Sequence, residues 1–192
     1  MVQPPIIIDT VARDQERRRK RIRHLSRLMA VGCLVTSVML TSAMLLYWTL
    51  TPAQTLFSQA GISNAPVADI DVLTRTLAFT ISMIPLGTLI YGFLNARRCF
   101  AAFAAGQIFS SEQVKRLKAF SIAAAVSGLL KPLAGAALSV LLSFSNLTGR
   151  RTLALNIGSD TLIVLIFAGT VAVIAWVMAE AIDISDENKQ FV

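Results

Sequence analysis

Lys131 has the most unusual setting for chemistry, because it is the only charged residue in the apolar run from Phe120 to Phe144. An ionisable side chain inside a bilayer is costly and usually has a partner or a function. Pro132 follows it, and its missing N–H leaves the carbonyl of Gly128 without a helical donor. From the position of each residue along its helix, we predict that Lys131 lies near mid-membrane and pairs with Glu180.

Three other interpretations of Lys131 remain open. Asp160 is a rival acidic partner, although we expect its side chain to lean away from the lysine. Lys131 can also snorkel along a groove between helices. Finally, it shares a helix face with small residues, which either pack against a second helix or line a path for a solute. The small residues in the run 120–144 are Ala124, Ser127, Gly128 and Gly135. Those in the run 162–179 are Ala168, Ala172, Ala175 and Ala179.

Basic residues are the second chemical feature, since most of the 18 lysines and arginines flank apolar runs. Beside a membrane, each such residue gains roughly 1 kcal/mol from anionic lipid headgroups. We prefer this interpretation to nucleic-acid binding, which a basic run also allows. The candidate residues for contact with lipid or a protein partner are Arg17, Arg18, Arg19, Lys20, Arg21, Arg97, Arg98, Lys115 and Arg116.

No catalytic, metal or cofactor motif can be assembled from the remaining residues. His24 is the only histidine, and Cys33 and Cys99 match no zinc or disulfide spacing. Asp183 and Glu187 belong to an acidic end that we interpret as solvated rather than as a cation site. We therefore expect a protein without enzymatic activity, metal or cofactor.

These residues must be positioned by helices that cross a membrane. The chain has 192 residues, of which 55% are hydrophobic and 15% charged, an apolar excess that a soluble domain of this size cannot bury. The first apolar run measures roughly 35 Å at about 1.5 Å per residue, enough for a bilayer core of about 30 Å. We predict an all-α polytopic membrane protein with four transmembrane helices, at residues 28–50, 72–94, 120–144 and 162–179.

Basic residues also predict the orientation of the spans. Eight of them precede the first span and five lie in residues 97–118, whereas residues 51–71 contain none. Positive residues stay on the cytoplasmic side, so both ends of the chain should face the cytoplasm. The predicted parts are a basic N-terminal segment (1–27), a four-helix transmembrane domain (28–182) and a C-terminal tail (183–192).

The segment between the second and third spans is predicted to form a cytoplasmic helical hairpin. Gly106 suits the end of a helix that continues from the second span. Ser110 suits the cap of the next helix, with Gln113 at the capping-box position. The N-terminal segment has Ile22 and Leu25 at helical spacing, so we expect it to form a helix that lies at the membrane interface.

Residues 95–117, NARRCFAAFAAGQIFSSEQVKRL, resemble the hallmark of a bacterial membrane family known as domain of unknown function 2975. The resemblance rests on a helix that ends in Gly106, a turn from Ile108 to Ser110 and a basic helix after it. The C-terminal end, from Met178 to Val192, is also similar. The likeness covers nearly the whole chain. It implies four spans in the bacterial inner membrane, no assigned reaction, and a place alongside small helix-turn-helix regulators.

We therefore interpret the chain as a small non-enzymatic integral membrane protein whose cytoplasmic surface binds a protein regulator or another partner. The alternative is a small transporter or channel subunit that uses Lys131. Charge reversal in the hairpin and replacement of Lys131 are the experiments that distinguish the two.

Overall fold

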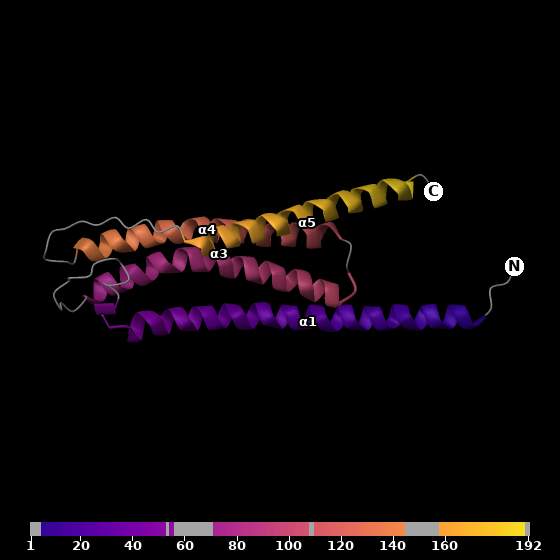
Figure 1. Cartoon of the computed structure of the whole chain (residues 1–192), viewed down its shortest axis with the longest axis horizontal. Coiled ribbons are helices and arrows are strands. Elements are labelled where there is room, and N and C mark those ends of the chain that lie inside the picture. The colour runs from indigo at the N-terminus through magenta and orange to yellow at the C-terminus, as the bar shows by residue number, and fades with distance from the viewer. Residues whose placement is uncertain (1–4, 53, 56–70, 108–109, 145–157, 191–192) are drawn as a thin grey trace.

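The computed structural model describes the chain except residues 1–4, 53, 56–70, 108–109, 145–157 and 191–192 (Figure 1). Its long helices are α1 (Pro5–Leu50), α3 (Val72–Ala104), α4 (Ser111–Phe144) and α5 (Ser159–Gln190), and the described residues contain no strand. Each of these helices is long and apolar enough to cross a membrane. The prediction of an all-α fold with four spans is confirmed, and the chain is a multi-pass membrane protein.

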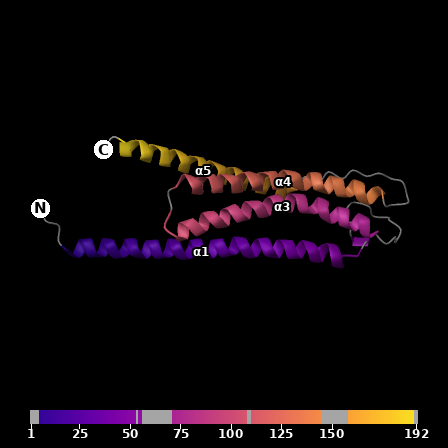
Figure 2. The same cartoon turned by 180° about the vertical axis from the view of Figure 1, so that it is seen from behind.

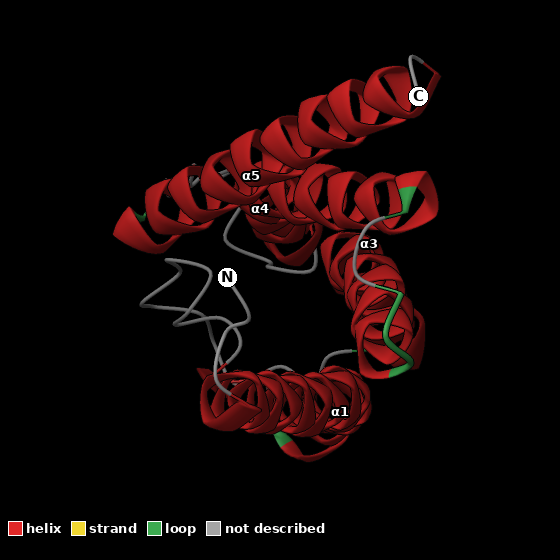
Figure 3. Ribbon diagram, turned by 90° about the vertical axis from the view of Figure 1, so that its right-hand side faces the viewer, coloured by secondary structure: helices red, strands yellow, loops and turns green. Residues whose placement is uncertain are grey.

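The helices run up and down beside one another in chain order. The main contacts join α1 to α3, α3 to α4 and α4 to α5. Viewed from one end, the four helices follow an arc with α1 and α5 at its two ends (Figure 3). The start of α1, the end of α3, the start of α4 and the end of α5 lie at one end of the molecule in both side views (Figures 1 and 2). We call this end the hairpin end.

The first helix is longer than its membrane span. α1 has 46 residues, about 69 Å at the rise of an α-helix. The basic segment is helical, as predicted, but α1 continues straight past the rest of the hairpin end instead of turning into the plane of the interface (Figure 2). Residues 16–31 contain neither proline nor glycine, so nothing interrupts the backbone hydrogen bonds there. The expected boundaries at 27/28 and 182/183 therefore fall inside α1 and α5.

Small residues set the distance between neighbouring helices. A Cβ atom added to Gly128 would lie 3.2 Å from Cγ1 of Val164, and one added to Gly92 would lie 3.1 Å from Cβ of Ala123. Ala124, Ala168 and Ala175 are buried, whereas Ser127 is buried toward α3. The predicted close packing of α4 on α5 is confirmed. Gly135 is exposed and takes no part in this contact, because no atom of the described residues lies within 4 Å of a Cβ added there.

Pro85 lies inside α3, which bows near its middle, as the proline predicts (Figure 1). Its carbonyl oxygen accepts a hydrogen bond of 2.7 Å from the Ser127 hydroxyl on α4 and another of 2.7 Å from Thr88. In a bilayer, hydroxyl groups between helices find protein partners because lipid offers none. The bond from Ser127 therefore helps to set the offset between α3 and α4 along their axes.

Arg75 joins the start of α3 to the end of α1. Its guanidinium donates to the carbonyl of Thr49 at 3.4 Å and to that of Thr51 at 3.0 Å. The last carbonyls of a helix lack helical donors and carry its negative dipole end, so a cation is favourable there. Arg75 of α3 thus caps the end of α1 from the neighbouring helix.

Candidate functional site

Lys131 pairs with Asp160, not with Glu180. The Lys131 ammonium contacts the Asp160 carboxylate in an ion pair and hydrogen bond. Both side chains are exposed, Lys131 by 65% and Asp160 by 56%. Glu180 lies about 20 residues further along α5, roughly 30 Å away along the helix axis. The predicted Lys131–Glu180 pair is therefore wrong.

The error lies in the offset between α4 and α5. The prediction aligned the ends of their two apolar runs, which put Asp160 level with the far end of α4. In the structure, α5 instead begins beside the middle of α4, because Val164 packs on Gly128 and Asp160 reaches Lys131. Lys131 is thus level with the first turn of α5. Asp160 also lies where the helix dipole favours a negative charge.

The remaining residues of the predicted Lys131 site lie in different surroundings. Gly128 is buried at the contact with Val164, where it lets α5 approach closely. Pro132 is an internal residue of α4 and is partly exposed. Glu180 is exposed near the hairpin end. The structure therefore brings Lys131, Gly128 and Pro132 together on α4, and places Glu180 apart from them.

The turn after α3 has the geometry that Gly106 predicts. Gly106 has a φ of +91°, the left-handed region that a residue without Cβ adopts freely. Its N–H donates to Phe103 at 3.0 Å, and the N–H of Gln107 donates to Ala102 at 3.1 Å. This pair of bonds is the Schellman motif that closes a helix. The predicted end at Gly106 of the helix that continues from the second span is confirmed, whereas Ile108 and Phe109 lie outside the described residues.

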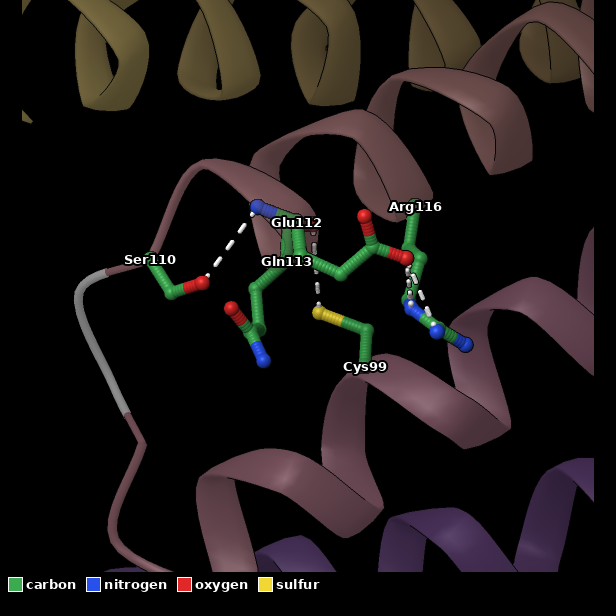
Figure 4. Close-up of polar contacts among 5 residues, drawn as sticks. All are labelled: Cys99, Ser110, Glu112, Gln113 and Arg116. Atoms are coloured by element: carbon green, nitrogen blue, oxygen red, sulfur yellow. Dashed lines mark hydrogen bonds and ion pairs between the residues drawn. The ribbon is translucent and has the colours of Figure 1, made fainter.

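The start of α4 differs from the predicted capping box (Figure 4). The Ser110 hydroxyl caps the helix by accepting from the N–H of Glu112 at 3.3 Å. The Gln113 side chain does not make the reciprocal hydrogen bond of a capping box. The residue is only 4% exposed, and its Oε1 has no hydrogen-bond partner among the described residues. It lies against α3 instead, where the Cys99 thiol donates to its backbone carbonyl at 3.6 Å. Packing between the two helices thus displaces the local motif.

The candidate basic residues gather at the hairpin end. Arg97, Arg98 and Lys115 are exposed on α3 and α4. Arg116 is half-buried and forms an ion pair of 2.9 Å with Glu112 (Figure 4). The other candidates, all exposed on α1, are Arg17, Arg18, Arg19, Lys20 and Arg21. The structure brings cations from three helices to one end of the molecule.

Comparison with known proteins identifies the family. A family described as "Protein of unknown function (DUF2975)" matches residues 55–192, which is more than half of the chain. The chain belongs to this family. In this DUF2975 protein the match includes α3, α4 and α5 but not α1, so the likeness is narrower than the sequence resemblance implied. No curated protein and no solved structure matches the chain.

The family description names no reaction, so the function is inferred from the arrangement of residues. Among the described residues, no group of three or more His, Cys, Asp or Glu is placed to hold a metal ion. Cys33 and Cys99 are both free. What the DUF2975 chain does present is the set of exposed cations at the hairpin end.

Proposed function

We propose that this DUF2975 protein is a non-enzymatic membrane protein whose hairpin end binds a protein regulator or similar partner in the bacterial cytoplasm. One observation carries the proposal: exposed cations from α1, α3 and α4 meet at the same end of the bundle. Such a surface attracts an acidic partner over a distance and orients it on approach.

The orientation we propose follows from the same charges. Eight basic residues precede the first apolar run and five lie around the turn from α3 to α4. Because cytoplasmic segments carry the excess of lysine and arginine, the hairpin end faces the cytoplasm and the protein resides in the inner membrane. The N-terminus, the turn and the C-terminus are then all available to a cytoplasmic partner.

The ends of α1 and α5 suggest the chemistry of that partner. Both helices extend beyond the turn that joins α3 and α4 (Figure 1). The α1 extension exposes Arg17 to Arg21, whereas the end of α5 exposes Asp183 and Glu187. A partner seated between them should present acidic groups toward α1 and the turn, and basic groups toward α5.

Charge reversal at the turn tests the proposal. The full-length protein is tagged and recovered from mild detergent, with Arg97→Glu and Lys115→Glu combined in one variant. Recovery of the partner should fall at least tenfold, because both cations become repulsive. A matched variant with Arg97→Lys and Lys115→Arg keeps the charges and should recover the partner as the unchanged protein does. Equal recovery by the reversed variant contradicts the proposal.

The alternative function, a transporter or channel subunit that uses Lys131, stays a prediction. Lys131 pairs with Asp160 on an exposed surface, which does not favour a role for Lys131 in lining a path for a solute. Loss of solute flux on Lys131→Ala, with the protein still folded, is the result that supports it.

A further inference from the structure

A groove lies between α4 and α5 toward the hairpin end. Its volume is about 340 Å³, within the size range of ligand pockets. Lys118 and Ser121 on α4, and Ala172, Ala175, Trp176 and Ala179 on α5, are among its lining residues. The groove thus combines an apolar channel with one cation.

The groove exists because small side chains face each other there. Ala175 is fully buried, and Ala172 and Ala179, about one turn to either side of it, also line the groove. The Ser121 hydroxyl already donates to the Lys118 carbonyl at 2.9 Å, so it adds no free polar group to the wall. The channel therefore suits a hydrocarbon chain rather than a polar solute.

Lys118 and Trp176 locate one end of the groove at the membrane boundary. Lys118 is exposed and comes just before the apolar run of α4, while Trp176 comes near the end of the apolar run of α5. Trp176 is 73% exposed, and tryptophan side chains favour the headgroup level of a bilayer. Two different spans thus place the cation of the groove where phosphate groups lie.

We propose that this groove binds one acyl chain of an anionic phospholipid, with the Lys118 ammonium on its phosphate. An amphiphile with an apolar chain and a negative head matches the groove in both shape and charge. The site differs from the general attraction of the basic surface for lipid, because it selects one lipid molecule by seating its chain. It also stands apart from the protein partner proposed above.

Tryptophan fluorescence can test the site directly. The chain has two tryptophans, so Trp48→Phe leaves Trp176 as the only emitter. The protein is placed in nanodiscs of phosphatidylcholine with a minor share of phosphatidylglycerol, and bromine is carried on the acyl chains of one lipid or the other. Bromine on phosphatidylglycerol should quench Trp176 several-fold more, per mole of lipid, than bromine on phosphatidylcholine.

Two lysine variants separate the groove from diffuse surface charge. Lys118→Gln should remove the preference for phosphatidylglycerol. Lys115→Gln removes another exposed cation, three residues away, that is not among the residues lining the groove, and should retain the preference. Ala172→Phe fills the channel and should reduce quenching by both lipids. If Trp48→Phe fails to fold, the difference in quenching between the unchanged protein and Trp176→Phe gives the same quantity.

Two results overturn the proposal. One is equal quenching per mole by both lipids in the protein with Lys118 intact. The other is an equal loss of preference in Lys118→Gln and Lys115→Gln, which would assign the effect to the basic surface as a whole.

Discussion

The Lys131 ammonium, partway along α4, contacts the Asp160 carboxylate in the first turn of α5. This pair holds the start of one apolar helix against the middle of another. Each charged group provides the other with a counter-charge, and an unpaired charge within an apolar span is costly. The relationship explains how the only charged residue in the apolar run of α4 is tolerated.

The first prediction concerns this pair. Asp160→Asn leaves the lysine without its counter-charge and should lower the apparent Tm in lipid nanodiscs by a few degrees. The exchanged variant, Lys131→Asp with Asp160→Lys, restores opposite charges and should recover most of the loss. Differential scanning fluorimetry checks both. An exchanged variant no more stable than Asp160→Asn would show that the contact contributes nothing.

A second prediction uses two glycines of α4. Gly128→Leu drives a side chain into Val164 and should destabilise the protein by about 1–3 kcal/mol, as overpacking does. Gly135→Leu meets no atom of the described residues within 4 Å at its Cβ and gains helix propensity of up to about 1 kcal/mol, so it should be neutral or mildly stabilising. Unfolding in mixed micelles with increasing dodecyl sulfate measures the difference. Similar effects at the two positions would contradict the close contact of α4 with α5.

The hydrogen bond from Ser127 to Pro85 gives a third prediction. Ser127→Ala removes the donor, and the loss should be about 0.6 kcal/mol and no more than roughly 1.7 kcal/mol, as for other hydrogen bonds between membrane helices. Thr170→Ala is the matched control, because among the described residues that exposed hydroxyl bonds only to the carbonyl of Ile166 in its own helix. The same micelle unfolding experiment applies. A larger loss from Thr170→Ala would count against the interhelical bond.

The fourth prediction is the orientation. With Cys33 and Cys99 replaced by alanine, a cysteine at exposed Gln54 should react in intact cells with a reagent that cannot cross the inner membrane. A cysteine at exposed Ser111 should react only after that membrane is opened. Labelling of Ser111 in intact cells would reverse the proposed orientation.

Features that depend on one segment of chain could be predicted from the sequence. Apolar runs of sufficient length predicted the four spans, since backbone groups in lipid must bond within a helix. Gly106 predicted the end of α3 because its position requires a positive φ, which the structure shows. These signals are local, and the surrounding fold leaves them unchanged.

The offset between two packed helices could not be predicted in the same way. Hydrophobic periodicity reports which face of a helix is apolar, but it does not report how far two helices are displaced along their axes. The sequence therefore predicted Glu180 as the ion-pair partner of Lys131. The contact of Val164 with Gly128 sets an offset that places Asp160 beside Lys131 instead. Gln113 was assigned to a cap for the same reason, although its contact with α3 determines where it lies.

The unbroken course of α1 has a mechanical consequence. Because α1 runs unbroken from its basic segment into its apolar run, a tilt of the basic part also tilts the apolar part. A tilt of about 10° around the midpoint of this roughly 69 Å helix moves each end by about 6 Å. The far end is the one that Arg75 joins to α3 through the carbonyls of Thr49 and Thr51.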